Sequence, residues 1–185
     1  TLIGAFCVFS TTTLYTIANK LTTAANAILI QYSAPVFIML IMWLMFRERP
    51  KRLDIITGVV VFFGIACFVM DGLGTGRMLG NALALLSGIT FAGVFVLNKI
   101  PGGDPFSSTI LGQMMSALVG LPFLLGDRDF SLLPVCFILL MGVLQMGTGY
   151  LMFCIGIKKT APVTASLISG VEPIMNPLLV AIVVG

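Results

Sequence analysis

Hydrophobic residues lie along the chain in seven long blocks, separated by short charged or Gly/Pro-rich segments. Each block is close to the roughly 20 residues that a helix needs to cross a bilayer. Alternation with a period of two, the pattern of a transmembrane barrel, is absent. The blocks are Leu2–Asn19, Ala24–Phe46, Leu53–Met70, Met78–Leu97, Phe106–Leu125, Leu132–Ile157 and Pro162–Gly185. The pattern predicts about seven transmembrane helices.

The composition supports an all-α, polytopic integral membrane protein. Of the 185 residues, 58% are hydrophobic and 9% are charged, whereas soluble domains spend about 25% of their residues on charge. The chain has no His, and its four Cys lie inside apolar blocks without paired spacing. We therefore expect no cofactor and no metal site. The net charge of +3 sits in short loops, so we expect no nucleic-acid partner.

Lys and Arg concentrate in alternate loops between the predicted helices. Segment 47–52 holds four of the ten, Lys99 follows two loops later, and Lys158–Lys159 two loops after that. The other loops carry Lys20, Arg77 and Arg128. By the positive-inside rule the first set of loops is cytoplasmic.

An internal repeat appears when the chain is shifted by 138 positions. Segment 20–35 then lies over segment 158–173, with Lys, Thr and Pro among the identical residues. The identical pairs are Lys20/Lys158, Thr22/Thr160, Ala27/Ala165, Leu29/Leu167, Ile30/Ile168 and Pro35/Pro173. Five predicted spans separate equivalent points, so the two copies face opposite ways across the membrane, as in many secondary transporters. Chance similarity between two Ala/Leu/Ile-rich helices is the alternative.

A family resemblance rests on residues of both copies. The residues of the first copy are Tyr15, Ala18, Ala27, Gln31 and Pro35, followed by the loop Arg47-Glu48-Arg49-Pro50 and by a predicted helix that contains Gly58 and Gly64. The residues of the second copy are Tyr150, Gly156, Lys158, Ala165 and Glu172-Pro173. The order and spacing of these residues resemble the drug/metabolite transporter superfamily, EamA type. Arg47 stands where that family often has Gly.

The resemblance implies a ten-helix fold of two five-helix repeats with inverted topology. Helices three to nine are expected here, with the first two helices and the last outside this sequence. Residues 1–72 correspond to the last three helices of the first repeat, and residues 77–185 to the first four of the second. Members of the family move amino acids, drugs, nucleobases and other metabolites, so the resemblance leaves the substrate open.

Glu172 is the one charged residue deep inside a predicted span. An intramembrane charge costs several kcal/mol unless it is paired or neutral, so this carboxyl group could couple transport to protons or bind a substrate amine. Ser169, Glu172 and Asn176 share one helix face, and Pro173 and Pro177 leave carbonyls without helical partners. The alternative is a protonated carboxyl group that only aids packing.

Further polar residues occupy other spans at comparable depth. Gln31 and Tyr32 lie beside Pro35 in the helix that matches the Glu172 helix, and two kinked polar helices facing each other would form a binding site. Tyr15, Gln113, Gln145 and Tyr150 are uncharged polar residues within apolar blocks. They are candidates for the substrate pathway, and interhelical hydrogen bonds are the alternative for each. Thr11-Thr12-Thr13 is expected to bond back to helical carbonyls.

These features predict a secondary transporter, working as an exporter of small metabolites or drugs, and not an enzyme. An importer, or an exchanger of nucleotide-sugar or phosphate-ester type, is the alternative within transporters, although no predicted span has the mid-depth Lys or Arg that a phosphate needs. A membrane-embedded enzyme or a receptor is a further alternative. We expect a small-molecule substrate, protons as candidate coupling ion, the lipid bilayer of the bacterial inner (plasma) membrane as surroundings, and a homodimer as a candidate assembly.

Overall fold

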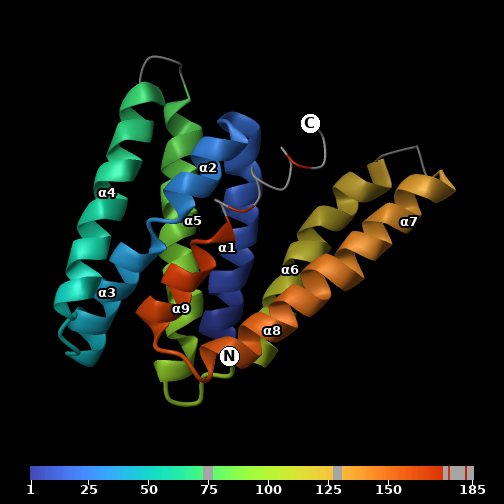
Figure 1. Cartoon of the computed structure of the whole chain (residues 1–185). Helices are drawn as coiled ribbons and strands as arrows, with labels where there is room; N and C mark the ends of the chain where they lie inside the picture. The colour runs from blue at the N-terminus through green and yellow to red at the C-terminus, as the bar shows by residue number, and fades with distance from the viewer. Residues whose placement is uncertain (73–76, 127–130, 173–174, 176–181, 183–185) are drawn as a thin grey trace.

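A computed structural model describes residues 1–72, 77–126, 131–172, 175 and 182, with the side chains of 65, 67–72, 98 and 125 left aside. All regular elements in this part of the chain are helical. They are α1 (Leu2–Leu21), α2 (Ala24–Gln31), α3 (Ala34–Phe46), α4 (Arg52–Gly72), α5 (Met78–Val96), η1 (Leu97–Lys99), α6 (Pro105–Gly126), α7 (Leu132–Leu140), η2 (Met141–Gly147), α8 (Thr148–Ile157) and α9 (Pro162–Ser169) (Figure 1).

Five helical segments are long and apolar enough to cross a membrane. They are Leu2–Leu21, Ala24–Phe46, Met78–Val96, Pro105–Leu124 and Leu132–Ile157. The prediction of a polytopic, all-helical membrane protein is therefore confirmed. Helix α4 is long as well, with 21 residues, but it is not among these five. The seventh predicted block extends beyond the described residues, which include its first helix, α9.

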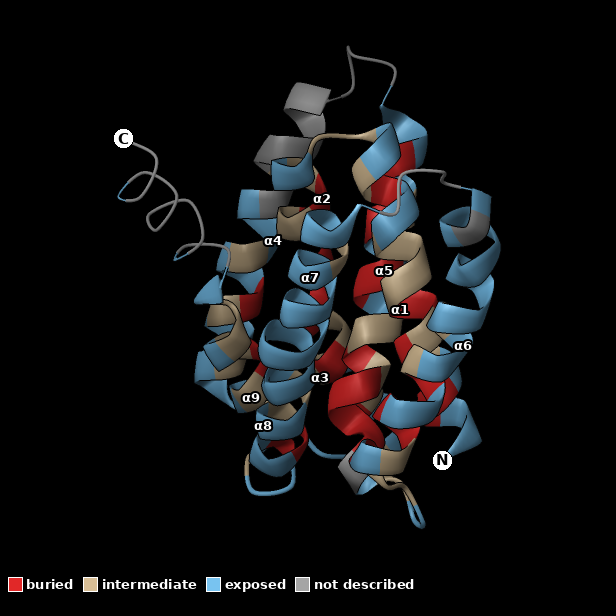
Figure 2. Ribbon diagram, turned by 90° about the vertical axis from the view of Figure 1, so that its right-hand side faces the viewer, coloured by how far each residue is buried: buried red, intermediate tan, exposed pale blue. Residues whose placement is uncertain are grey.

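Helices α1 and α5 lie side by side at the centre of the molecule, and α6 packs on the other side of α1. Buried residues concentrate on α1 and α5, whereas most of α6 and most of α7 are exposed (Figure 2). The approach of α6 to α1 depends on Gly112, because a Cβ there would lie 2.6 Å from Val8 Cβ and 2.7 Å from the Ala5 carbonyl oxygen. Gly112 therefore allows the close contact between α6 and α1, whereas a Cβ on Gly120 in the same helix meets no described atom within 4 Å.

The predicted block Ala24–Phe46 is interrupted at Tyr32–Ser33, which separates α2 from α3. Pro35 has no N–H to offer the Gln31 carbonyl, so the helical ladder fails at this turn. Gly88 of α5 faces the break, where a Cβ would lie 2.8 Å from Ser33 Oγ and 2.9 Å from the Gln31 carbonyl oxygen. The expected proline kink is present, and a glycine on the neighbouring helix accommodates it.

A second break follows α9. The N–H of Gly170 bonds to the Ser166 and Leu167 carbonyls, and that of Val171 bonds to Ile168, so the helix tightens and stops before Glu172. Helix α9 runs from 162 to 169 and α2 from 24 to 31. Both ends differ by 138 positions, the offset of the sequence repeat.

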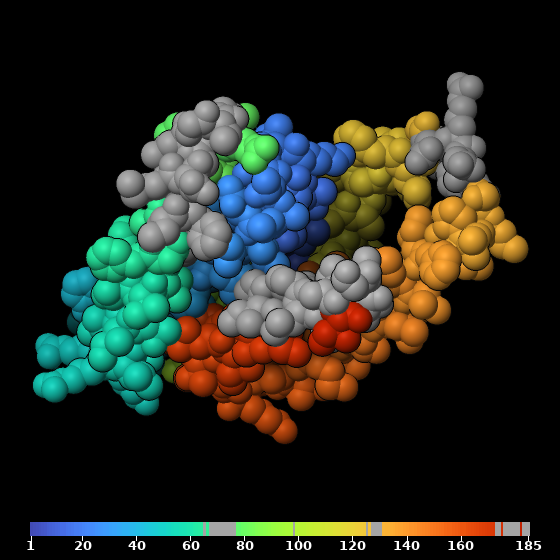
Figure 3. Space-filling model, turned by 45° about the horizontal axis from the view of Figure 1, so that its top comes forward, coloured from blue at the N-terminus to red at the C-terminus, as the bar shows by residue number. Residues whose placement is uncertain are grey.

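A third irregularity lies between α7 and α8. Residues Met141–Gly147 form a π-helical segment, which keeps the predicted span Leu132–Ile157 continuous. Thr148 Oγ1 donates to the Leu144 carbonyl within it. Such segments are rare and frequently mark functional sites. Seen from the end opposite the charged loops, α7 stands at the edge of the molecule, away from α1 and α5 (Figure 3).

The three basic loops meet at one end of the helices (Figure 1). Lys99 Nζ bonds to Glu48 Oε1 at 2.9 Å, and Lys158 Nζ lies 3.0 Å from Asp104 Oδ1. Arg47, directly after α3, has φ 55°, the left-handed conformation, and the Glu48 N–H bonds back to the Met42 carbonyl. A side chain thus occupies a helix-ending position that favours glycine.

Candidate functional site

A cavity of about 390 Å³ lies between α1, α5, η2–α8 and the turn after α9; we call it the central cavity. Its lining mixes hydroxyl, amide and carboxyl groups with aromatic rings. The lining includes Thr11, Thr12, Phe91, Gln145, Tyr150, Phe153, Ser169 and Glu172. A few polar groups in a largely apolar wall are typical of small-molecule sites.

Glu172 is the one Asp, Glu, Lys or Arg among the described residues that line the central cavity. The Tyr32 phenol donates a hydrogen bond to Glu172 Oε2 at 2.9 Å. Tyr32 belongs to the break after α2, and Glu172 follows the break after α9, so the two interruptions bring these side chains together. Tyr32 also stands edge-on to the Phe91 ring, with centroids 6.4 Å apart.

An aromatic cluster forms one wall of the cavity. Phe91 and Phe153 line the cavity, and each contacts Phe95, with ring centroids 4.9 and 5.1 Å from it. Phe95 is fully buried in the apolar cluster that joins α3, α5 and α8. Edge-to-face packing of this kind fixes ring orientation, so Phe91 and Phe153 are held in place from behind.

Hydroxyl groups of α1 form the opposite wall. Thr11 Oγ1 donates to the Cys7 carbonyl at 2.7 Å and lies 2.9 Å from Thr90 Oγ1, and Thr12 Oγ1 donates to the Val8 carbonyl at 3.0 Å. The predicted back-bonding is confirmed for both. Their place in the cavity wall was not predicted, although a run of hydroxyl groups in mid-span was the available signal.

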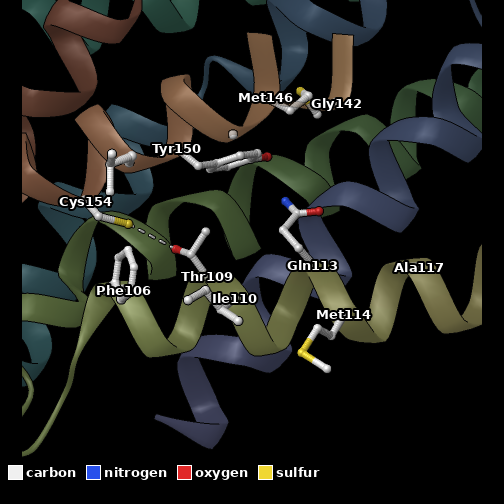
Figure 4. Close-up of a pocket in the computed structure, with 12 residues that line it drawn as sticks. Phe106, Thr109, Ile110, Gln113, Met114, Ala117, Gly142, Met146, Tyr150 and Cys154 are labelled. Carbon is white, nitrogen blue, oxygen red and sulfur yellow. Dashed lines mark hydrogen bonds between the residues drawn. The ribbon is translucent and has the colours of Figure 1, made fainter. Parts of the chain in front are cut away.

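A second cavity of about 680 Å³, the lateral cavity, lies between α6 and η2–α8 (Figure 4). Thr109, Gln113 and Cys154 line it, and Tyr150 and Met146 line both cavities. The Tyr150 and Gln113 side chains face each other in Figure 4. The Tyr150 hydroxyl pairs with the side chains of Gln113 and Thr12. Tyr150 therefore separates two neighbouring spaces.

The structure brings most of the predicted pathway residues together. Glu172, Ser169, Gln145 and Tyr150 line the central cavity, Tyr32 bonds to Glu172, and Gln113 lies behind Tyr150 in the lateral cavity.

Besides Tyr32, which reaches the central cavity through its bond to Glu172, two described residues among those predicted line neither cavity. Tyr15 packs against an apolar cluster that includes Ala18 and Ala27. Gln31 is buried, with its backbone carbonyl against Gly88. Asn176, Pro173 and Pro177 lie outside the described residues. Among those described, no three His, Cys, Asp or Glu side chains gather at one point.

These features define a multispan integral membrane protein with a polar cavity at two helix breaks. The chain belongs to the EamA-like transporter family, whose model matches residues 1–70 and 78–185. It is also similar to an uncharacterized transporter of Clostridium kluyveri, with 25% identity over 197 aligned positions. That alignment covers all of this chain and 63% of the relative's length. No solved structure matches the chain.

Proposed function

We propose that this chain carries the solute site of a secondary transporter that exports small metabolites or drugs across the bacterial plasma membrane. The contact between Tyr32 and Glu172 carries the proposal, because it joins the two helix breaks at a cavity. Transporters commonly bind solute near the bilayer midplane at discontinuous helices. Family membership supports a transporter, and a transporter-named relative supports it further.

Two inverted repeats, residues 1–72 and 77–185, would supply the moving parts. The equal offset of 138 between the ends of α2 and α9 supports this division. Alternating access then consists of one repeat rocking against the other about the central cavity.

The packing between the central cavity and the basic loops supports alternating access. Along α5 and α8, the apolar cluster around Ile38, Phe95 and Ile157 lies between the central cavity and the basic loops. The ion pairs Glu48–Lys99 and Asp104–Lys158 follow at the end itself. Exposed ion pairs of this kind contribute at most about 1 kcal/mol each, so they can hold one end shut and still release it.

Glu172 is the proposed coupling residue. A carboxyl group on a cavity that opens to alternate sides can take a proton from one side and release it to the other. Solute and proton would then share one group, and occupation by one would displace the other. The phosphate-ester alternative receives no support, because no Lys or Arg is among the residues that line the central cavity.

The test is untargeted metabolite profiling of medium and cell extract from a bacterial host that expresses the full-length gene. Glu172→Gln is compared with the wild type, and Asp54→Asn is the matched control. Asp54 is a half-buried carboxylate at the start of α4 that accepts the Lys51 N–H at 3.0 Å, a bond that Asn can keep. Compounds that accumulate outside with the wild type and Asp54→Asn, but not with Glu172→Gln, support the proposal.

Three other results would change it. Depletion of a compound from the medium would make the protein an importer. Equal export by Glu172→Gln would remove Glu172 from coupling. Chemical conversion of a compound, without movement, would replace the transporter with an enzyme.

A further inference from the structure

We infer that the central cavity takes an organic monocation, an amine that carries one aromatic ring. The inference deepens the proposed function, on which it rests, by naming the solute class of the same site. Charge, hydrogen-bond polarity, ring packing and size each bear on it separately.

The charge of the cavity is one-sided. Glu172 is its carboxylate, and no cationic side chain lines it. Two of the nearby lysines, Lys99 and Lys158, are held at the loop end by Glu48 and Asp104. Tyr32 supplies a single neutral donor to Glu172, and a carboxylate at membrane depth needs a charged partner or a proton. A cationic solute provides that partner.

The hydroxyl groups of the wall present acceptors. The Ser169 hydroxyl donates its one proton to the Ala165 carbonyl of its own helix, at 3.1 Å. Since a hydroxyl has one proton and two lone pairs, the lone pairs remain for a ligand. Tyr32 spends its proton on Glu172 in the same way. An ammonium group, with its N–H donors and no acceptor, matches these acceptor groups.

The aromatic wall favours a ring next to the charge. Phe91 and Phe153 are fixed by Phe95, and Tyr150 adds a third ring to the lining. Ring faces attract a cation within about 6 Å and pack against a flat solute. The volume of about 390 Å³ is near the lower end of the roughly 300–1,000 Å³ of ligand pockets. One ring with a short amine side chain suits this space better than a nucleotide or a polycyclic drug.

The test is isothermal titration calorimetry on the full-length protein in detergent, with two probes of the same ring and chain. Phenethylamine is the cation and 3-phenylpropionate the anion. The wild type should bind phenethylamine about tenfold more tightly than 3-phenylpropionate, or better, because a hydrogen bond to a charged group is worth roughly 1.5–3 kcal/mol. Equal affinity for both probes, or no heat from phenethylamine at millimolar concentration, would overturn the inference. This comparison needs no variant.

Variants assign the binding to named residues. Glu172→Gln should weaken phenethylamine binding about tenfold or more, and Phe153→Leu about two- to fivefold, while Asp54→Asn leaves it unchanged. Size-exclusion chromatography of each variant checks that it is folded. Unchanged binding by a folded Glu172→Gln would refute the assignment.

Transport separates this inference from the proposed function. If phenethylamine binds at Glu172 but is not transported into proteoliposomes, the inferred solute class stands and the proposed transport function fails. If the protein transports an anion or a solute without a ring and does not bind phenethylamine, the proposed transport function stands and the inferred solute class is refuted.

Discussion

Gly112 offers the sharpest test of the packing that positions the cavity. The substitution Gly112→Ala places a Cβ 2.6 Å from Val8 Cβ, 2.7 Å from the Ala5 carbonyl oxygen and 2.8 Å from Val8 Cγ1. None of these atoms is the end of a flexible side chain, so α6 must move away from α1. Gly120→Ala is the matched control in the same helix, since its Cβ meets no described atom within 4 Å.

The expected difference in unfolding free energy between the two variants follows from two contributions. Replacing Gly by Ala inside a helix gains about 1 kcal/mol in propensity, and this gain is common to both variants. Overpacking costs about 1–3 kcal/mol and falls on Gly112→Ala alone. The free energy of unfolding of Gly112→Ala should therefore lie about 1–3 kcal/mol below that of Gly120→Ala.

Unfolding by SDS in mixed micelles, followed by far-ultraviolet circular dichroism, measures this difference. The displacement of α1 also moves Thr11 and Thr12, so Gly112→Ala should weaken solute binding while Gly120→Ala does not. Equal unfolding free energies for the two variants would refute the close approach of α1 and α6.

Three further substitutions test single features by the same unfolding measurement. Arg47→Gly should raise the free energy of unfolding by about 0.5–1 kcal/mol, since the left-handed conformation costs a side chain about 1–2 kcal/mol and the extra chain entropy of Gly offsets part of the gain. Ser33→Ala should raise it by about 1 kcal/mol, because Ser33 Oγ is buried without a partner among the described residues. Hydrogen bonds from Ser107 and the ion pair with Lys158 hold the pKa of Asp104 below its ordinary 3.8. The ionised carboxylate therefore stabilises the fold above pH 3.8, and this stabilisation is lost as the pH falls through the folded-state pKa. Asp104→Asn should lack this part of the acid-induced decrease in the free energy of unfolding.

Each of the three has a matched comparison. Arg49→Gly should bring no gain, since Arg47 is the one non-glycine residue with positive φ in the described part of the chain. Ser131→Ala changes an exposed serine and should be nearly neutral. Parallel acid unfolding curves for the wild type and Asp104→Asn would contradict the role given to Asp104, and a loss of stability in Arg47→Gly or Ser33→Ala would contradict those assignments.

The helices were predictable because lipid as solvent imposes a simple rule of length and apolarity. The break at Tyr32–Ser33 was predictable as well, since Pro35 removes a specific backbone donor. The π-helical segment Met141–Gly147 was not, because no Pro occurs in or just after it and its residues are ordinary for a span. A π turn arises when a backbone N–H bonds to the carbonyl five residues earlier and not four. The choice between these two hydrogen-bond patterns depends little on the residue types.

The site was predictable in its residue types but not in its pairings. The sequence singles out Glu172 as the one charge deep inside a predicted span, while its hydrogen bond with Tyr32, 140 positions away, depends on how two helix breaks come to face each other. Thr11 and Thr12 were assigned only their local hydrogen bonds, because the cavity beside them exists only after α1, α5 and α8 pack. Tyr15 was predicted to line the substrate pathway, but in the structure it packs against an apolar cluster.

The two segments related by the offset of 138 share helix ends but differ in the polar side chains at their breaks. Under the shift of 138, the helix ends of α2 and α9 coincide, but Tyr32 matches Gly170 and Glu172 matches Ala34. Both halves therefore carry a break, while one half supplies the phenol and the other the carboxylate. Under the proposed function, a single carboxylate would let proton and solute compete for one group, and a second acid at Ala34 would put two like charges at the same depth and raise the desolvation cost. In the proposed transporter, the different side chains on equivalent breaks would thus leave one binding group in a repeated scaffold.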